Sequence, residues 1–274
     1  MKKTLYVHET HIMPDSLMPF IFHTDRICER RIVPNWHENI ELLCFIEGEG
    51  RLKCGGELYS VRAGDVAVIN PNTLHVTEGE LVYHCLIIDK SFCDSNGIPV
   101  LSLHFEEIIK SGELYEAFVA AAEAIRAARE GGDALTSVLR ARHAVLFLLC
   151  ELCEKHMLSE PPESRARVAA SERVKSVMTY IRENFARPVT LDGIADAVGV
   201  SKYHLTREFK QMTGTTIFDS LNVIRCKEAR HMLSEGATVS EAANACGFEN
   251  LSYFSRTFKK YTGKLPSEYT RSSK

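Results

Sequence analysis

The sequence of 274 residues predicts an α+β protein of two domains, the first built on a β-barrel and the second made only of helices. Two observations predict this division. Short apolar runs alternate with turn signals over roughly the first hundred residues, as in antiparallel sandwiches and barrels. From about Glu106 onward, apolar residues recur at the three- and four-residue spacing of helices. The chain is long enough to bury two separate cores.

Turn signals define the N-terminal domain, residues 1–105. They lie at Glu47–Gly50, Cys54–Gly56, Ala63–Asp65 and Asn70–Thr73, between short apolar runs. The two glycines in "KCGGE" suit a two-residue hairpin turn, because such turns require positive φ. We therefore expect several short strands that form a barrel.

Residues 106–158 predict a helical hairpin. One or two helices run from Glu106 to Glu130 and stop at two glycines, and another opens at Asp133, which can act as its N-cap. The last helix has a wide apolar face made of Leu135, Val138, Leu139, Val145, Leu146, Leu149 and Leu152. Such a face must be covered, either by the first helix of the hairpin or by a second subunit.

A linker and a basic domain complete the chain. Residues 159–171 contain two prolines, several charges and no apolar period, which indicates an interdomain linker. Residues 172–274 show helical periodicity and no strand-like alternation. Residues 171–274 hold 16 Lys and Arg against 11 Asp and Glu, a net +5, whereas residues 1–170 carry −8. This asymmetry indicates a polyanionic partner for the C-terminal domain alone.

A basic, aromatic segment occurs twice in the C-terminal domain. "GVSKYHLTREFKQMTG" ends at Gly214 and "FENLSYFSRTFKKYTG" ends at Gly263, with Arg, Phe, Lys and Thr at matching positions. A short helix and a glycine turn precede each segment. Two helix-turn-helix motifs are therefore predicted, at about 191–210 and 239–260.

The second helix of each motif suits the major groove of DNA. In the first motif, Lys202, Tyr203, Thr206 and Arg207 surround an apolar side, and arginine can pair with guanine. A helix predicted from Ile217 to Leu233 joins the motifs and is about 25 Å long, on the scale of the ~34 Å between successive major grooves. One chain would then place two reading helices in successive grooves.

The same residues carry a family resemblance. "IADAVGVSKYHLTREFKQMTG" and "EAANACGFENLSYFSRTFKKYTGKLPSEYT" resemble the DNA-binding domain of the AraC/XylS family of bacterial transcription regulators. The resemblance implies double-stranded promoter DNA as a partner and, usually, activation of transcription by RNA polymerase. Leu251 stands where a polar residue is often found and would offer an apolar contact, such as one to a thymine methyl. The implied base-contacting positions are Lys202, Tyr203, Thr206, Arg207, Leu251, Ser252, Tyr253, Ser255 and Arg256.

The N-terminal domain resembles the cupin-type sensor domain of the same family. "NWHENIELLCFIEGEG" and "AGDVAVINPNTLH" match the two cupin motifs, and Asn35 replaces the first histidine of the metal-binding pattern. His37, Glu41 and His75 remain, so the expectation is that Asn35, His37, Glu41 and His75 line a pocket for a small polar effector such as a sugar, with no metal and no cofactor. The alternatives are a metal site on these residues or a hydrogen-bonded barrel interior. The resemblance also implies a homodimer through residues 106–158, with a monomer as the alternative.

Three further expectations concern chemistry and location. The Cys150–Cys153 pair, with His156 nearby, permits a thiol or metal site, but i, i+3 spacing on an apolar helix favours reduced, packed thiols. The chain is expected to be a regulator and not an enzyme, with a metal-dependent cupin enzyme or a thiol-based redox sensor as alternatives. No apolar signal follows the two N-terminal lysines, and no apolar run approaches the roughly 18 residues of a membrane helix, so a cytoplasmic protein is expected.

Overall fold

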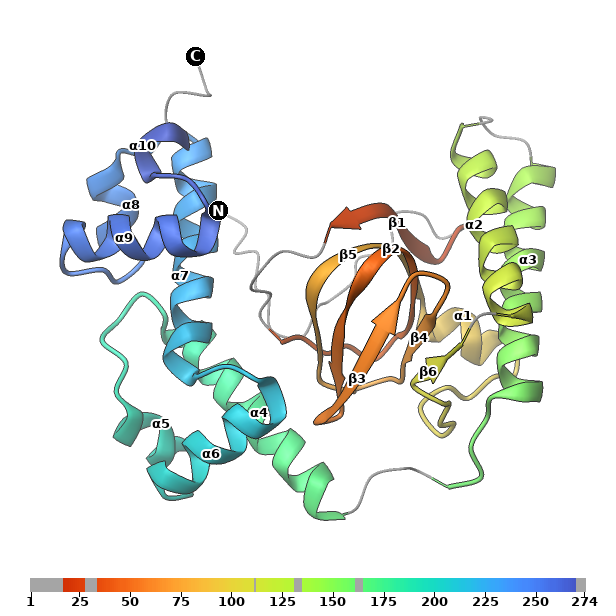
Figure 1. Cartoon of the computed structure of the whole chain (residues 1–274), viewed down its shortest axis with the longest axis horizontal. Coiled ribbons are helices and arrows are strands. Elements are labelled where there is room, and N and C mark those ends of the chain that lie inside the picture. The colour runs from red at the N-terminus through yellow and green to blue at the C-terminus, as the bar shows by residue number, and fades with distance from the viewer. Residues whose placement is uncertain (1–16, 28–33, 111, 131–134, 161–164, 270–274) are drawn as a thin grey trace. The chain divides into compact units, whose positions relative to one another are not determined.

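The computed structural model describes residues 17–27, 34–110, 112–130, 135–160 and 165–269 (Figure 1). The chain forms two compact units that divide between Arg167 and Val168. The N-terminal unit contains one antiparallel sheet with helices, and the C-terminal unit contains only helices, so the predicted fold class is confirmed.

The N-terminal unit is built on a six-stranded sheet with the order β1-β5-β2-β4-β6, in which β3 also pairs with β2. Every pairing is antiparallel. The strands are β1 (Phe20–Ile27), β2 (Ile40–Cys54), β3 (Glu57–Arg62), β4 (Val66–Ile69), β5 (His75–Ile88) and β6 (Ile108–Ile109).

Three of the four predicted turns are confirmed. Gly55 and Gly56, with φ of 56° and 88°, join β2 to β3 as the tight hairpin expected from paired glycines. Gly64, with φ of 89°, lies between β3 and β4, and Asn72, with φ of 61°, lies between β4 and β5.

The fourth predicted turn, Glu47–Gly50, is wrong: β2 continues through it. A β-bulge follows Phe45, and Gly50 pairs with Gly79 in the middle of the ladder between β2 and β5. A Cβ on Gly79 would lie 2.7 Å from the Cα of Gly50, so the two backbones approach too closely for side chains. Glycines of this kind mark sharp bends in a sheet, and the predicted turn is in fact a corner of the barrel.

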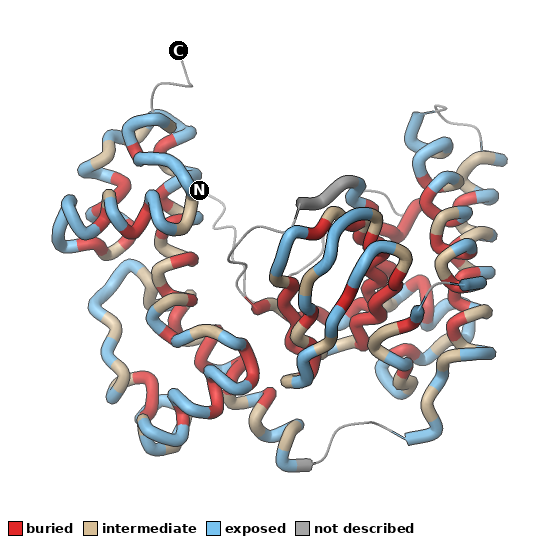
Figure 2. The backbone as a smooth tube through the Cα atoms, viewed as in Figure 1, coloured by how far each residue is buried: buried red, intermediate tan, exposed pale blue. Residues whose placement is uncertain are grey.

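Helices cover the outside of the sheet. The first half of β2 is buried without interruption (Figure 2). Ile40, Leu42 and Cys44, which share one face of the strand, belong to one core cluster with residues of the helices. The helices of this unit are α1 (Lys90–Ser95), α2 (Glu113–Glu130) and α3 (Leu135–Lys155). Segments around Phe105 and Met157 pair as an isolated bridge near the end of α3.

Two local assignments in this unit differ from expectation. Helix α1 lies in the region predicted to contain only strands, because Asp89 caps it by accepting a hydrogen bond from the Ser91 backbone N–H at 2.8 Å. Ile108 and Ile109 form β6 inside the region predicted as helix, because these β-branched residues pair with Ala67 and Val66 of β4.

The C-terminal unit consists of helices around a long central helix, α7 (Figure 1). Its first helix begins at Arg165, so the second half of the predicted linker 159–171 is helical. That segment, "RARVAAS", lies beyond both prolines and contains good helix formers. The helices are α4 (Arg165–Asn184), α5 (Leu191–Val198), α6 (Lys202–Thr213), α7 (Ile217–Ser234), α8 (Val239–Ala245), α9 (Leu251–Thr262) and α10 (Pro266–Tyr269). Within the described residues, no helix is long and apolar enough to cross a membrane.

Candidate functional site

The first reading helix, α6, has one buried and one exposed side. Leu205 and Phe209 are fully buried, and the Ser201 hydroxyl caps the helix by accepting a hydrogen bond from the His204 backbone N–H at 3.3 Å. Gly214 ends the helix in the left-handed conformation. The side chains predicted to contact DNA lie on the other side: Tyr203 is 79% exposed, Thr206 and Arg207 are exposed, and Lys202 is half-buried.

The second reading helix, α9, repeats this construction. Phe254 and Phe258 are buried where α6 has Leu205 and Phe209. The Asn250 side chain accepts a hydrogen bond from the Tyr253 backbone N–H at 2.9 Å. The structure thus confirms both predicted helix-turn-helix motifs as helix pairs, α5–α6 and α8–α9. Leu251, Ser252, Tyr253 and Arg256 are exposed, and Ser255 is half-buried.

Several predicted contact residues already have partners within the unit. The Lys202 ammonium lies 2.9 Å from Asp192 of α5, on the surface. The Thr206 hydroxyl donates to the Lys202 backbone carbonyl at 2.8 Å. The Tyr253 hydroxyl accepts a hydrogen bond from Asn222 of α7 at 3.2 Å. Tyr253 is therefore positioned by the central helix, whereas an exposed ion pair such as Lys202–Asp192 is weak enough to exchange for a phosphate.

Polar contacts that sequence reasoning missed hold both reading helices in place. Glu208 on α6 accepts two hydrogen bonds from Arg173 on α4, at 2.8 and 2.6 Å. On α9, the Tyr261 hydroxyl donates to Asp219 of α7 at 2.5 Å. The only sequence signal for the first contact is an acidic residue inside a basic helix, and nothing in the sequence points to its partner 35 residues away.

Arg225 of α7 joins the two halves of the unit. Its guanidinium donates to the backbone carbonyls of Phe185 and Arg187, at 2.8 and 2.9 Å, and lies over the ring of Phe248. Burial lowers the pKa of Arg225 from its ordinary value. The neighbouring Gly247 has φ of 76°, and a Cβ there would lie 2.7 Å from the Phe185 carbonyl oxygen. The second motif is therefore packed against the end of α4.

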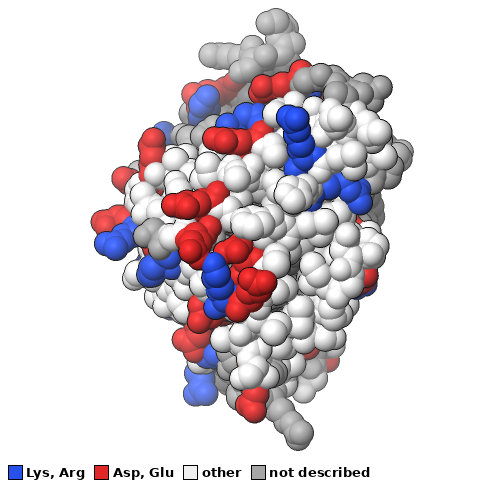
Figure 3. Space-filling model, turned by 90° about the vertical axis from the view of Figure 1, so that its right-hand side faces the viewer, with Lys and Arg blue, Asp and Glu red and all other residues white. Residues whose placement is uncertain are grey.

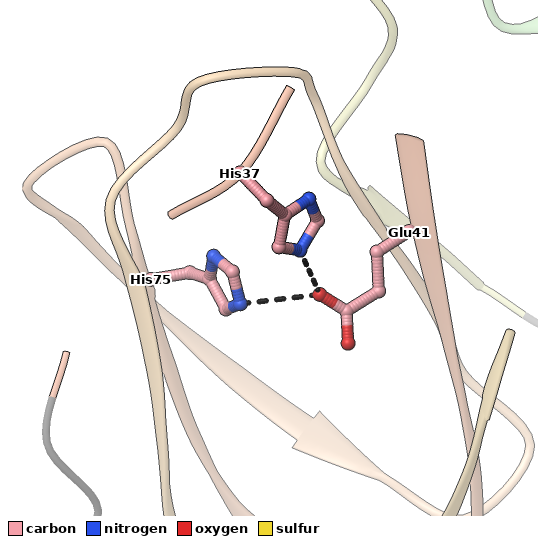
Figure 4. Close-up of side chains that lie close together, drawn as sticks. All are labelled: His37, Glu41 and His75. Carbon is pink, nitrogen blue, oxygen red and sulfur yellow. Dashed lines mark hydrogen bonds and ion pairs between the residues drawn. The ribbon is translucent and has the colours of Figure 1, made fainter. Parts of the chain in front are cut away.

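Three of the four residues predicted to line a ligand pocket lie together in the N-terminal unit (Figure 4). The Nε2 atoms of His37 and His75 lie 2.8 and 3.2 Å from the same carboxylate oxygen, Oε2 of Glu41. The side chains of His37, Glu41 and His75 are 1%, 9% and 7% exposed. Because His75 pairs with Cys54 and Glu41 pairs with Ile87, near opposite ends of one ladder, only the bend of the sheet brings them together.

Backbone and thiol groups surround this cluster. The Nδ1 atom of His37 lies 2.9 Å from the Asn39 carbonyl oxygen, and that of His75 lies 3.0 Å from the Thr73 carbonyl oxygen. The Cys85 thiol donates to Oε1 of Glu41 at 2.9 Å. Burial raises the pKa of Glu41, but the hydrogen bonds and charge of His37 and His75 outweigh burial and hold the pKa well below its ordinary value.

The fourth predicted residue, Asn35, contributes through its backbone. It exchanges two main-chain hydrogen bonds with His75, at 3.0 and 3.2 Å. A separate open groove of about 530 Å³ includes Gly50, Arg51 and Lys110 in its lining. None of the residues that line this groove belongs to the His37–Glu41–His75 cluster.

The Cys150–Cys153 pair has no feature of an activated thiol. Cys150 is exposed, and its hydrogen bond to Glu154 raises the pKa of its thiol. Burial raises the pKa of Cys153, and His156 is instead paired with Glu106 at 3.1 Å. Reactive cysteines have lowered pKa values, so these environments oppose thiolate formation.

Comparison with known proteins agrees with both parts of this structure. Residues 20–141 match the model of the AraC-like ligand-binding domain, and residues 194–272 match that of a helix-turn-helix domain. The chain is 29% identical to the HTH-type transcriptional regulator YbfI of Bacillus subtilis, over 80% of each chain. It is 32% identical over 124 residues to an HTH-type transcriptional regulator encoded in the cgkA 5′ region of Pseudoalteromonas carrageenovora, covering 43% of this chain and 74% of that protein.

The chain belongs to the AraC family of transcription regulators. A further AraC-type relative, the HTH-type transcriptional activator RhaR of Pectobacterium atrosepticum, is 26% identical over 85% of this chain and 84% of its own length. The family prediction is thus confirmed. As an AraC-family member, this protein is a DNA-binding transcription regulator with a ligand-binding domain.

Proposed function

We propose that this AraC-family protein activates transcription from specific promoters in the cytoplasm, in response to a small polar effector such as a sugar. In this proposal residues 1–105 sense the effector, residues 106–158 form a homodimer, and residues 172–274 bind DNA and act on RNA polymerase. The protein acts as a regulator and not as an enzyme. The observation that carries the proposal is the pair of capped, exposed reading helices, α6 and α9, on one scaffold.

The exposed side chains of α6 and α9 support sequence-specific binding. Arg207 and Arg256 occupy equivalent positions, and both are exposed. Arginine recognises guanine through two hydrogen bonds, while lysines and hydroxyl groups bind phosphates. The 18 residues of α7 span about 27 Å, which is compatible with readers placed in neighbouring major grooves. The remaining proposed contacts are Lys202, Tyr203, Thr206, Leu251, Ser252, Tyr253 and Ser255.

The buried polar cluster supports the effector proposal. His37, Glu41 and His75 are the kinds of side chain that bind hydroxyl-rich molecules, and Asn35 fixes the backbone of His75. Binding there would change transcription only if the effector had different affinities for two states of the protein. Activation is supported by one relative, RhaR, whose name describes an activator.

The surface of α3 supports a homodimer. Leu135 and Phe147 are 68% and 53% exposed, and Leu139 lies between them at four-residue spacing from Leu135. On the side of the molecule shown in Figure 3, uncharged side chains form a broad band with acidic groups gathered beside it. An exposed apolar stripe on a long helix suits a matching stripe on a second copy. The rest of the predicted apolar face, such as Leu149 and Leu152, is buried within the unit.

DNA binding by the full-length protein tests the proposal. Fluorescence anisotropy with promoter fragments flanking its own gene, at two salt concentrations and with competitor DNA, separates specific from general binding. The double variant R207A/R256A should lose specific binding. The control is Arg230→Ala, which removes an exposed positive charge from α7 without changing a reading helix. Equal, steeply salt-dependent binding to all sequences, with and without candidate sugars, would contradict sequence-specific regulation.

A further inference from the structure

We propose that Asn222 of the central helix α7 is a positioning residue for DNA recognition: it holds the Tyr253 hydroxyl so that the hydroxyl hydrogen is offered to an acceptor atom of the DNA. The inference rests on the proposed function, because it takes α9 as a reading helix. It goes beyond that function because it gives a role in recognition to a residue outside both helix-turn-helix motifs, in the helix that joins them.

Asn222 holds the hydroxyl end of the Tyr253 side chain. Its side-chain amide donates a hydrogen bond to the Tyr253 hydroxyl oxygen at 3.2 Å, across 31 residues of sequence. Tyr253 is 45% exposed, and an exposed side chain ordinarily changes rotamer within picoseconds to nanoseconds. The bond from α7 therefore restricts where the hydroxyl lies.

Phe248 holds the ring end of the same side chain. The ring centroids of Phe248 and Tyr253 lie 6.1 Å apart with 53° between the ring planes, within the range of attractive aromatic pairs. Phe248 is buried, and the Arg225 guanidinium lies over its ring at 5.6 Å from the centroid. Arg225 in turn donates to the backbone carbonyls of Phe185 and Arg187. Tyr253 is thus held at two points, its ring and its hydroxyl.

Both supports come from one side of α7. Asn222 and Arg225 are three residues apart in the helix, a spacing that places two side chains on the same side. Both are half-buried, and burial lowers the pKa of Arg225 from its ordinary value. The central helix therefore holds the second motif in the region of Tyr253, and Asn222 is the residue that bonds directly to a proposed DNA contact.

The direction of the hydrogen bond decides what Tyr253 offers to DNA. The amide nitrogen of Asn222 only donates, so it occupies a lone pair of the Tyr253 oxygen. The hydroxyl hydrogen is not used in this contact and remains to be donated. DNA presents acceptors in its phosphate oxygens and in the purine N7, guanine O6 and thymine O4 atoms of the major groove. Tyr253 would therefore act toward DNA as a donor.

The place of Tyr253 in α9 suits such a contact. It is the third residue of the helix, and recognition helices contact base edges through their N-terminal residues. Its backbone is also fixed, because its N–H donates to the Asn250 side chain at 2.9 Å. A side chain that is ordered before binding loses less conformational entropy on binding and so binds more tightly. Removal of Asn222 should weaken DNA binding by removing this order.

A double-mutant cycle on the full-length protein tests the proposal by anisotropy titration of promoter fragments flanking its own gene. Tyr253→Phe removes the hydroxyl, keeps the ring, and should weaken specific binding about two- to tenfold, the effect of one hydrogen bond. Asn222→Leu replaces the amide by an apolar group of similar size and should weaken specific binding within the same range. In protein that already carries Tyr253→Phe, Asn222→Leu should have little further effect, because no hydroxyl is left to position.

Single-base variants of the bound fragment identify the acceptor. Loss of discrimination by Tyr253→Phe at one base position places the acceptor on a base edge. An equal loss of affinity for every base sequence places it on a phosphate, since phosphates carry no sequence information.

Two results would overturn the proposal. One is an Asn222→Leu protein that binds DNA like the parent. The other is a loss from Asn222→Leu that is as large with Tyr253→Phe as without it, since Asn222 would then act independently of the hydroxyl. Asn222→Ala, which removes the amide without adding an apolar group, repeats the cycle, and urea unfolding checks that both variants fold. Parent protein without specific binding would refute the proposed function and this inference together, whereas specific binding unaffected by Asn222→Leu refutes only the inference.

Discussion

Gly50 and Gly79 lie opposite each other in the ladder between β2 and β5, where a Cβ on Gly79 would lie 2.7 Å from the Cα of Gly50. The ladder bends at this point, and the bend brings Glu41 near one end close to His75 at the other. The two glycines are therefore part of the construction of the buried cluster, although neither touches it.

Replacing Gly79 by alanine should destabilise the N-terminal unit. Its φ of 126° is unfavourable for alanine, and the added carbon meets the facing backbone. We expect a loss of about 1–3 kcal/mol from backbone strain, with more from the overlap. Gly97→Ala is the matched control: its φ is 78° but open space surrounds it, so conformational strain of about 1 kcal/mol is expected. Urea unfolding measures both, and equal losses would show that the close approach does not matter.

The Glu208–Arg173 pair should make the stability of the C-terminal unit depend on pH. The two hydrogen bonds from Arg173, opposed by burial, lower the pKa of Glu208 below its ordinary value. A carboxyl group with a lowered folded-state pKa stabilises the fold above its unfolded pKa of about 4.3, and this contribution disappears as the pH falls through the folded-state value. Glu208→Gln should therefore cost about 1–3 kcal/mol at pH 7 and much less at acidic pH. Urea unfolding at pH 7 and near pH 3 measures this difference. A loss that is the same at both values would assign the effect to packing and not to charge.

Arg207→Ala and Arg256→Ala should each weaken specific DNA binding by roughly 1–3 kcal/mol if each arginine pairs with a guanine. Anisotropy titrations with the parent operator and with single-base variants measure the loss. An arginine that reads a base should also lose discrimination at one position. A uniform loss for every sequence, with a smaller salt dependence, would identify that arginine as a phosphate contact.

The proposed dimer is best tested by a substitution in the exposed stripe of α3, which consists of Leu135, Leu139 and Phe147. A substitution of Leu146, another residue of the predicted apolar face, is less specific. Leu146 is half-buried and packs on the core, so an aspartate there would damage the fold as well as an interface. Phe147 is 53% exposed, and Phe147→Asp should convert a dimer to a monomer with little loss of monomer stability. Sedimentation equilibrium measures the mass. The control is Arg230→Asp, which introduces the same charge at an exposed residue of α7, outside the proposed interface. An unchanged mass for Phe147→Asp would reject this stripe as the interface.

Local patterns predicted most of the helical unit. The glycine turns before the reading helices and the apolar period between the motifs are local signals, and the two motifs and the helix predicted from Ile217 to Leu233 are confirmed. Contacts between helices were missed, such as Arg225 with Phe185, because they join residues distant in the sequence. The helix that begins at Arg165 was not predicted as starting there, because the two prolines just before it favour a linker.

The N-terminal unit was less predictable because a sheet is formed by distant residues. His37, Glu41 and His75 were identified from the resemblance to the cupin motifs, and the structure brings them together. Cys85 was not identified, since it approaches Glu41 across 44 residues. The sequence signal at Glu47–Gly50 was real, but it marks a bend within a paired strand and not a chain reversal. Ring nitrogen directions depend on the carbonyls of Asn39 and Thr73, which no sequence pattern reveals.

Hydroxyl-radical footprinting on a promoter bound by this protein tests the central claim most directly. Two reading helices on one scaffold predict protection of two segments about one helical turn, or roughly 10 base pairs, apart on one face of the DNA. Arg207→Ala should weaken protection of one segment and Arg256→Ala that of the other. A single protected segment, or weak protection spread evenly along the DNA and unaffected by either change, would contradict the assignment of α6 and α9 as two readers.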